Sequence, residues 1–211
     1  VEPGAFESDV SQALRGAGYT YARVGRSALA DSESADGVLT VGEAAFEALL
    51  VTDVPALDPS VLEAIEAAAA AGVPVIWLGE FPERADGLRD LETRDARVES
   101  SVSALEPLVA QISGSPDIPV ALSDAGVSPT LSPVSSEPLR VSIAHRRLAD
   151  GDLYYLFNES FEEVTEQLAL PPNRTVELFN PDTGARADPT VEADVLTVSL
   201  PPARGTILTL R

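Results

Sequence analysis

The first half of the chain alternates short apolar runs with stretches of helical spacing. Residues 48–54 (ALLVTDV) begin as a continuous apolar run, which is typical of a strand buried on both faces. Asp58 is then placed to cap a helix that has Pro59 at its first position. Gly72 stands where a left-handed C-cap belongs, and residues 73–79 (VPVIWLG) form the next apolar run. This order predicts a right-handed strand–helix–strand unit.

Weaker patterns flank that unit on both sides. Residues 6–14 favour a helix, residues 19–24 favour a strand, and residues 37–43 (GVLTVGE) indicate a short strand or hairpin arm. Downstream, helical spacing is kept by Val98, Val102, Leu105, Val109 and Ile112. Pro107 lies within this stretch and must kink or restart the helix. We therefore expect a three-layer α/β domain over residues 1–125.

The second half has a different pattern. Residues 123–138 (SDAGVSPTLSPVSSEP) are rich in serine and proline and are predicted to be a linker. Beyond them, short strand candidates separated by turn signals occupy residues 139–145, 152–158, 162–170, 174–180, 195–200 and 206–210. The strand at 152–158 is apolar on both faces, which places it in the middle of a sandwich or under a neighbouring domain. We expect residues 138–211 to form a small antiparallel β-sandwich.

One loop of this second domain has a specific turn signal. Residues 180–184 (NPDTG) separate two strand candidates, with Pro181 fixing φ at the first central position. Gly184 follows, where the chain must bend back into the sheet. We expect a hairpin in which Gly184 takes a positive φ.

Charge and cysteine content exclude several function classes. The chain has 34 acidic and 14 basic residues and a formal net charge of −20, which disfavours nucleic acid and anionic membrane surfaces as partners. No apolar run approaches the roughly 18 residues of a membrane helix. The absence of cysteine excludes disulfides and thiolate chemistry. Because position 1 is not methionine, we expect the chain to begin inside a longer polypeptide.

Few residues are candidates for catalysis. His145 is the only histidine, and no G-x-S-x-G elbow accompanies it, so we interpret it as a strand histidine that hydrogen-bonds locally rather than as a base. Asp53 and Glu80 each follow a predicted parallel strand, at the sheet edge where ligands bind. Such a pair could hydrolyse a glycosidic bond. The alternative is that Asp53 caps a turn and Glu80 is a solvated acid.

Candidates for binding are equally few. Arg147, Tyr154 and Tyr155 could contact a carbohydrate at the rim or face of the sandwich, although burial is the preferred interpretation of Tyr154. Trp77 lies inside a predicted buried strand and is interpreted as a core residue. No glycine-rich phosphate motif follows a strand, and no acidic stretch has calcium-loop spacing, so we expect neither cofactor nor metal.

The order of these motifs resembles a known architecture. Residues 46–84 resemble the class I glutamine amidotransferase-like domain found within several large glycoside hydrolases. The second half is similar to the C-terminal sandwich of rhamnosidase-type glycoside hydrolases. Its first motif is matched by His145, Arg146, Arg147, Gly151, Tyr155, Phe157 and Asn158, and its second by Glu177, Leu178, Pro181, Thr183 and Gly184. The resemblance covers roughly residues 6–210.

The resemblance implies a non-catalytic accessory region. It implies a flavodoxin-like or amidotransferase-like fold for residues 1–125, lacking the usual first strand, and a catalytic barrel upstream in the same polypeptide. The whole protein would then be an extracellular or periplasmic glycosidase, similar to alpha-L-rhamnosidases, acting on plant or microbial glycans. Without a cysteine nucleophile, glutaminase activity is excluded. A carbohydrate-binding module, and a stand-alone hydrolase that uses Asp53 and Glu80, are the alternatives.

Overall fold

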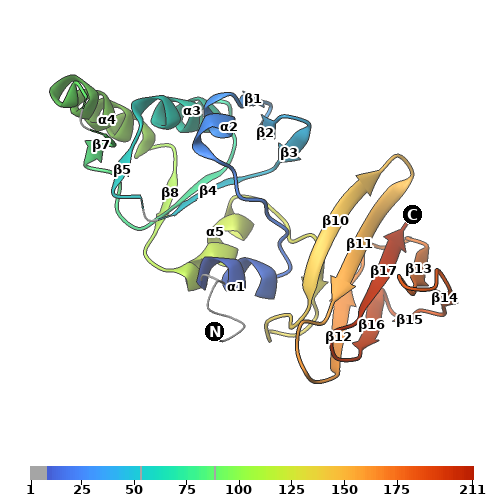
Figure 1. The fold of residues 1–211 in the computed structure, drawn as a ribbon. Helices are drawn as coiled ribbons and strands as arrows, with labels where there is room; N and C mark the ends of the chain where they lie inside the picture. The colour runs from blue at the N-terminus through green and yellow to red at the C-terminus, as the bar shows by residue number, and fades with distance from the viewer. Residues whose placement is uncertain (1–8, 53, 88) are drawn as a thin grey trace. The chain divides into compact units, whose positions relative to one another are not determined.

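The computed structural model describes residues 9–52, 54–87 and 89–211, and it divides into two compact units (Figure 1). The first, which we call the central unit, is the continuous segment Ala22–Val127. The second joins the described part of Val1–Tyr21 to Ser128–Arg211, and we call it the two-sheet unit. The chain thus combines mixed α/β structure with several antiparallel sheets.

A parallel sheet forms the centre of the central unit, with the strand order β4-β6-β8. Its strands are β4 (Leu49–Thr52), β6 (Val75–Leu78) and β8 (Ala110–Ile112). Helix α3 (Pro59–Ala70) connects β4 to β6, so the predicted strand–helix–strand unit is confirmed.

Both predicted ends of α3 are confirmed as well. The Asp58 side chain accepts a hydrogen bond from the backbone N–H of Ser60 at 2.9 Å, which satisfies one of the free donors of the first turn. After the helix, Gly72 has a φ of +83°, the left-handed conformation that ends a helix most easily at glycine.

Two further helices flank the parallel sheet. Helix α4 (Leu91–Leu105) packs against α3, and α5 (Ile118–Asp124) contacts β6 and β8. Figure 1 shows α3 and α4 on one side of the sheet and α5 on the other. The predicted extension of a helix through Ile112 is wrong, because α4 ends before Pro107 and the following residues enter the sheet as β8.

Smaller elements complete the central unit. They are a meander of three antiparallel strands, a short parallel pair, one short helix and one 3-10 turn: β1 (Glu33–Ala35), β2 (Val38–Val41), β3 (Ala44–Phe46), β5 (Ala56–Leu57), β7 (Arg84–Ala85), α2 (Arg26–Ala30) and η1 (Ser115–Asp117). Asp36 and Gly37 join β1 to β2 with positive φ at both positions, as a two-residue hairpin turn requires. The hairpin arm predicted at 37–43 is therefore confirmed.

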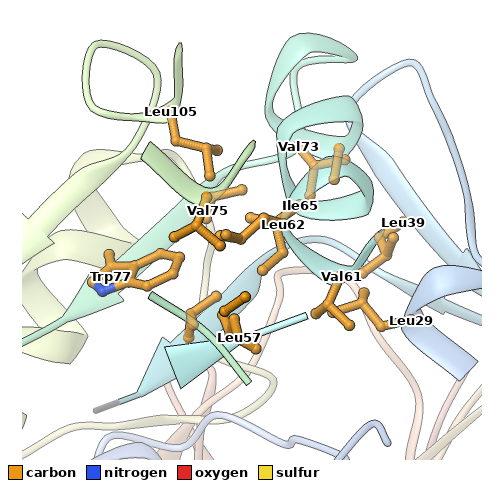
Figure 2. Close-up of a cluster of buried hydrophobic side chains, with 14 residues drawn as sticks. Leu29, Leu39, Leu57, Val61, Leu62, Ile65, Val73, Val75, Trp77 and Leu105 are labelled. Atoms are coloured by element: carbon orange, nitrogen blue, oxygen red, sulfur yellow. The ribbon is translucent and has the colours of Figure 1, made fainter. Parts of the chain in front are cut away.

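The core of the central unit lies between the sheet and helices α3 and α4 (Figure 2). Trp77 is completely buried there, which confirms its interpretation as a core residue. Figure 2 shows its ring beside Val75 and Leu57, with Leu62 and Ile65 of α3 above the sheet. The second strand of the unit thus holds the helices in place by packing rather than by polar contacts.

Two antiparallel sheets make up most of the two-sheet unit. One has the order β10-β11-β17-β13-β14 and the other β15-β16-β12-β9. The first consists of β10 (Ser142–Leu148), β11 (Gly151–Phe157), β17 (Gly205–Leu210), β13 (Val176–Phe179) and β14 (Arg186–Ala187). The second consists of β15 (Thr190–Glu192), β16 (Val195–Leu200), β12 (Val164–Ala169) and β9 (Ser132–Pro133). Side chains of both sheets belong to a single cluster of buried residues.

All six strands predicted beyond residue 138 are present. The predicted linker differs from the structure, because α5 includes Ser123 and Asp124, while β9 pairs with β12. Leu131 is buried in the core of the two-sheet unit. Much of the serine- and proline-rich stretch is therefore part of a folded unit rather than a spacer.

The N-terminal residues belong to the two-sheet unit, in contrast to the predicted domain of residues 1–125. Helix α1 (Asp9–Gly16) is followed by Gly18, whose carbonyl accepts hydrogen bonds from the N–H groups of Thr130 at 2.9 Å and Leu131 at 3.3 Å. Gly16 similarly accepts from Leu139 at 2.8 Å. The strand predicted at 19–24 does not form: the N–H of Tyr19 bonds back to the carbonyl of Leu14 at 3.0 Å, and that of Thr20 bonds to the Thr130 hydroxyl at 3.3 Å rather than to a neighbouring strand.

Candidate functional site

Four of the candidate residues lie on one hairpin, formed by β10 and β11. His145 is directly opposite Tyr154, and Arg147 is opposite Asp152. Opposite residues of antiparallel strands point to the same face. The face that carries the core therefore also bears the side chains of His145, Arg147, Tyr154 and Asp152. Tyr155 points to the other face of the sheet, so the structure separates it from the other three candidates.

His145 has two close contacts at this position. Its Nε2 lies 2.8 Å from Asp152 Oδ1, and its ring stacks on that of Tyr154 with centroids 4.7 Å apart and planes 12° apart. The imidazole and the carboxylate keep about a fifth of their side-chain surface exposed, 20% and 22%. The interpretation of His145 as a locally hydrogen-bonded strand residue is confirmed.

Tyr154 is the buried member of the cluster formed by His145, Arg147, Asp152 and Tyr154. Only 5% of its surface is exposed, as the interpretation of Tyr154 as a buried residue required. Burial and, to a smaller extent, the nearby Asp152 carboxylate raise the pKa of Tyr154 to about 12, against the opposing effect of the Arg174 and Arg147 guanidinium groups. The phenol is therefore neutral over the whole physiological range.

Sequence reasoning did not single out Asp152 or Arg174. The signal for Asp152 was its position two residues before Tyr154, which puts both side chains on one face of a strand. Arg174 comes from the segment before β13, so only the fold brings its charge near Tyr154. The cluster combines cationic donors with a carboxylate acceptor, a combination suited to holding polar groups in place.

The structure describes only one member of the proposed pair of catalytic carboxylates. Asp53 lies outside the described residues. Glu80 follows β6 with an exposed side chain, and its backbone carbonyl accepts a hydrogen bond from Trp77 Nε1 at 3.1 Å. It is the main chain of Glu80, rather than its carboxyl group, that the core holds in place.

Asn158, directly after β11, makes five side-chain hydrogen bonds. It is fully buried, and its Nδ2 donates to the carbonyls of Glu162 (2.7 Å), Leu200 (2.9 Å) and Pro201 (3.1 Å). Its Oδ1 accepts from the N–H and the hydroxyl of Ser160. These bonds tie the end of one sheet to the end of the other, so Asn158 has a structural role.

Within residues 9–52, 54–87 and 89–211, no three His, Cys, Asp or Glu side chains come together in a way that could bind a metal ion. None of the helices in this same part of the chain has both the length and the apolar character needed to span a membrane.

Comparison with known proteins identifies the family. A family model described as alpha-L-rhamnosidase, glycoside hydrolase family 106, matches residues 7–190. The chain belongs to this family. No curated protein matches the sequence.

Solved structures show the same fold within much larger chains. The rhamnosidase from Novosphingobium sp. PP1Y is 19% identical with a TM-score of 0.69, and the match covers 89% of this chain and 19% of that one. An exo-carrageenase GH42 from Bacteroides ovatus is 12% identical with a TM-score of 0.56, over 95% of this chain and 26% of that one. The chain therefore spans about a fifth to a quarter of the length of these two relatives.

Proposed function

We propose that this chain is a non-catalytic accessory region of a large glycosidase of the alpha-L-rhamnosidase family. The observation that carries the proposal is the unequal coverage in the comparison with the Novosphingobium rhamnosidase. Nearly all of this chain, 89%, corresponds to only 19% of that protein. A segment that small leaves room in the remaining polypeptide for a complete catalytic domain.

The chemistry of the candidate residues supports a structural role. The His145 ring is stacked on a neutral, buried tyrosine and hydrogen-bonded to Asp152. Asn158 joins the ends of the two sheets, and Glu80 faces solvent. A glycosidase needs an acid and a second carboxylate on opposite sides of a sugar bond. None of these contacts has that arrangement.

We assign an amidotransferase-like α/β fold to the central unit and a β-sandwich to the two-sheet unit. A parallel sheet with helices on both sides supports the first assignment, and two antiparallel sheets that share a buried core support the second. With no cysteine in the chain, the central unit has no glutaminase nucleophile and serves as a scaffold.

The proposal includes a partner and a location. The partner is a catalytic barrel upstream in the same polypeptide, which carries the carboxylates that cleave plant or microbial glycans. The whole protein acts outside the cytoplasm, in the extracellular medium or the periplasm. The strongly acidic surface, with a net charge of −20, is compatible with a soluble, neutral glycan as substrate and disfavours polyanions.

An activity assay tests the proposal. The purified 211-residue chain is incubated with a panel of aryl glycosides that includes aryl alpha-L-rhamnosides, beside the polypeptide encoded by the whole gene. We expect turnover by the longer polypeptide and none by the chain alone. Turnover by the chain that disappears in Glu80→Gln or Asp53→Asn would show that it is a stand-alone hydrolase.

A further inference from the structure

The five-stranded sheet carries apolar side chains on the face opposite its core. Side chains alternate along β11, so Tyr154 and Leu156 enter the core while their neighbours point outward. The same alternation applies to β17 and β13. We call the result the outer face and define it by Leu153, Tyr155, Phe157, Phe179 and Ile207.

The outer face is continuous across strands. Tyr155 lies directly opposite Ile207, and Ile207 lies directly opposite Phe179, so an apolar row runs from β11 through β17 to β13. Each of the five side chains is half-buried. A sheet face that only met water would instead alternate polar residues with the buried ones.

The aromatic residues are held in fixed positions. A Cβ at Gly205 would lie 2.6 Å from the hydroxyl oxygen of Tyr155, so the tyrosine ring leans over a position that only glycine leaves open. The rings of Tyr155 and Phe157 are 6.0 Å apart with planes inclined by 22°. Rigid aromatic residues of this kind lose little conformational entropy when a partner covers them.

Charged side chains surround the apolar row at its edge. The Arg186 guanidinium group lies over the Phe179 ring, with its carbon 5.5 Å from the ring centroid, and forms an ion pair with Glu177. On the other side, Arg146 is exposed next to Leu153 in the cross-strand register. An apolar centre rich in aromatic residues with a charged rim is the usual composition of a protein interface.

We propose that the outer face docks against another domain of the same polypeptide. This inference rests on the proposed function, in which about four-fifths of the protein lies outside this chain. In the Novosphingobium rhamnosidase, the corresponding segment is only 19% of the polypeptide. A second copy of this chain is disfavoured, because each copy carries a net charge of −20. A glycan is disfavoured because Leu153 and Ile207, in the second and third strands of the sheet, interrupt the aromatic residues with side chains on which a sugar cannot stack.

Hydroxyl-radical footprinting tests this docking surface without a mutation. Oxidation of Tyr155, Phe157 and Phe179 is followed by mass spectrometry in the 211-residue chain and in the polypeptide encoded by the whole gene. We expect oxidation of these residues to be slower in the longer polypeptide by about fivefold, because an interface core is closed to solvent. Phe161, which is 91% exposed, provides the internal control and should react at the same rate in both.

Each other outcome contradicts the proposal in a distinguishable way. Equal oxidation rates in both polypeptides mean that no domain covers the outer face. If oxidation of Phe161 is slowed as much as that of Tyr155, Phe157 and Phe179, the protection is not specific to the outer face. Protection of the 211-residue chain that grows with its own concentration indicates a second copy, and protection by added oligosaccharide indicates a glycan. Hydrolysis by the chain alone would overturn the proposed function without changing any of these rates.

A pair of variants provides a second measurement. Ile207→Glu places a charge in the middle of the outer face, and Val191→Glu places one at an exposed position of the other sheet. We expect Ile207→Glu to lower the Tm of the longer polypeptide by several degrees more than that of the 211-residue chain. Val191→Glu should shift both equally. An equal shift of both polypeptides by Ile207→Glu would contradict the docking.

Discussion

The ring of His145 lies flat on the ring of Tyr154, with centroids 4.7 Å apart, and its Nε2 is hydrogen-bonded to Asp152. One face of the imidazole is thus covered by a phenol and one nitrogen is bound to a carboxylate. The histidine consequently belongs to a small polar cluster that packs beside the core, and the tyrosine below it is almost fully buried.

We predict that alkaline unfolding depends on Tyr154. Its pKa is about 12 in the folded chain and 10.0 in the absence of burial. Below pH 10 the Tyr154 hydroxyl is protonated in both the folded and the unfolded state, and its full contribution to stability is present. Between pH 10 and 12 the hydroxyl loses its proton only in the unfolded state. The free energy of unfolding should therefore fall across this range, as measured by urea denaturation at closely spaced pH values.

Tyr154→Phe is the matched variant for this prediction. It keeps the ring that stacks on His145 and removes the titrating hydroxyl, so stability should fall less steeply between pH 10 and 12. The chain contains no lysine, so tyrosines dominate the titration in this range. Burial also raises the pKa of Tyr19, which leaves a residual slope in the variant. Identical slopes in the two proteins would refute the prediction.

A second prediction concerns the acid side of the pH range and Asp58. Hydrogen bonds from the hydroxyl and N–H of Ser60, and the charge of Arg94, lower the pKa of Asp58 below 3.8. Because the pKa of Asp58 is lower in the folded state than in the unfolded state, Asp58 stabilises the fold when the pH is above its unfolded-state pKa. This contribution is lost as the pH falls through the folded-state pKa. Asp58→Ala should cost about 1 kcal/mol at pH 7 and less at pH 3, measured by denaturation followed by circular dichroism.

Asp58→Asn separates the cap from the charge. Asparagine caps a helix about as well as aspartate, so this variant should keep most of the stability of α3 at pH 7 while losing the ion pair with Arg94. That pair is partly exposed, with 41% of the Asp58 side chain accessible, so its own contribution is small. If Asp58→Asn destabilises the chain as much as Asp58→Ala, the capping role is wrong.

Asn158 provides the third prediction. Asn158→Ala leaves the carbonyls of Glu162, Leu200 and Pro201 without this donor and should cost about 2–4 kcal/mol. The loss should appear in the unfolding of the two-sheet unit, with the helices of the central unit unaffected at the same denaturant concentration. Ser160→Ala keeps the N–H that donates to Asn158 and removes only the hydroxyl, with its bonds to Asn158 Oδ1 and the Glu162 carbonyl, so it should cost about 1 kcal/mol. A smaller loss for Asn158→Ala than for Ser160→Ala would be inconsistent with this role.

The fourth prediction isolates a backbone effect at Gly184. The residue has a φ of +69°, and a Cβ there would meet no atom within 4 Å. Gly184→Ala should therefore lower the free energy of unfolding by about 1 kcal/mol through backbone strain alone. Gly184→Asn should lose less, since asparagine tolerates this conformation better. An unchanged Tm in the alanine variant would contradict this account.

Local signals predicted much of this fold. The cap at Asp58, the glycines at 72 and 184, and the strands beyond residue 138 follow from residue chemistry that acts over a few positions. These features are predictable because neighbouring residues determine them. The strand β15 was missed because its two-residue turn uses Ala193 and Asp194 at positive φ without the glycine that normally marks such a turn.

Features that depend on distant residues were not predicted. The strand expected at 19–24 does not form, and the N–H of Thr20 bonds instead to the hydroxyl of Thr130, more than a hundred positions away. The contact between His145 and Asp152 needed the register of β10 on β11, which periodicity alone does not specify. The alternation within β11 did indicate an outward apolar side, which the register with β17 and β13 then extended into a surface.

The assignment of α1 to the two-sheet unit has a consequence for synthesis of the chain. Gly16 and Gly18 leave the ribosome more than a hundred residues before their hydrogen-bond partners Leu139, Thr130 and Leu131. The central unit lies between them in the sequence and can fold as soon as it emerges, because domains fold as units during translation. We therefore expect α1 and the residues that follow it to fold after the central unit, once the residues that bond to them have been synthesised.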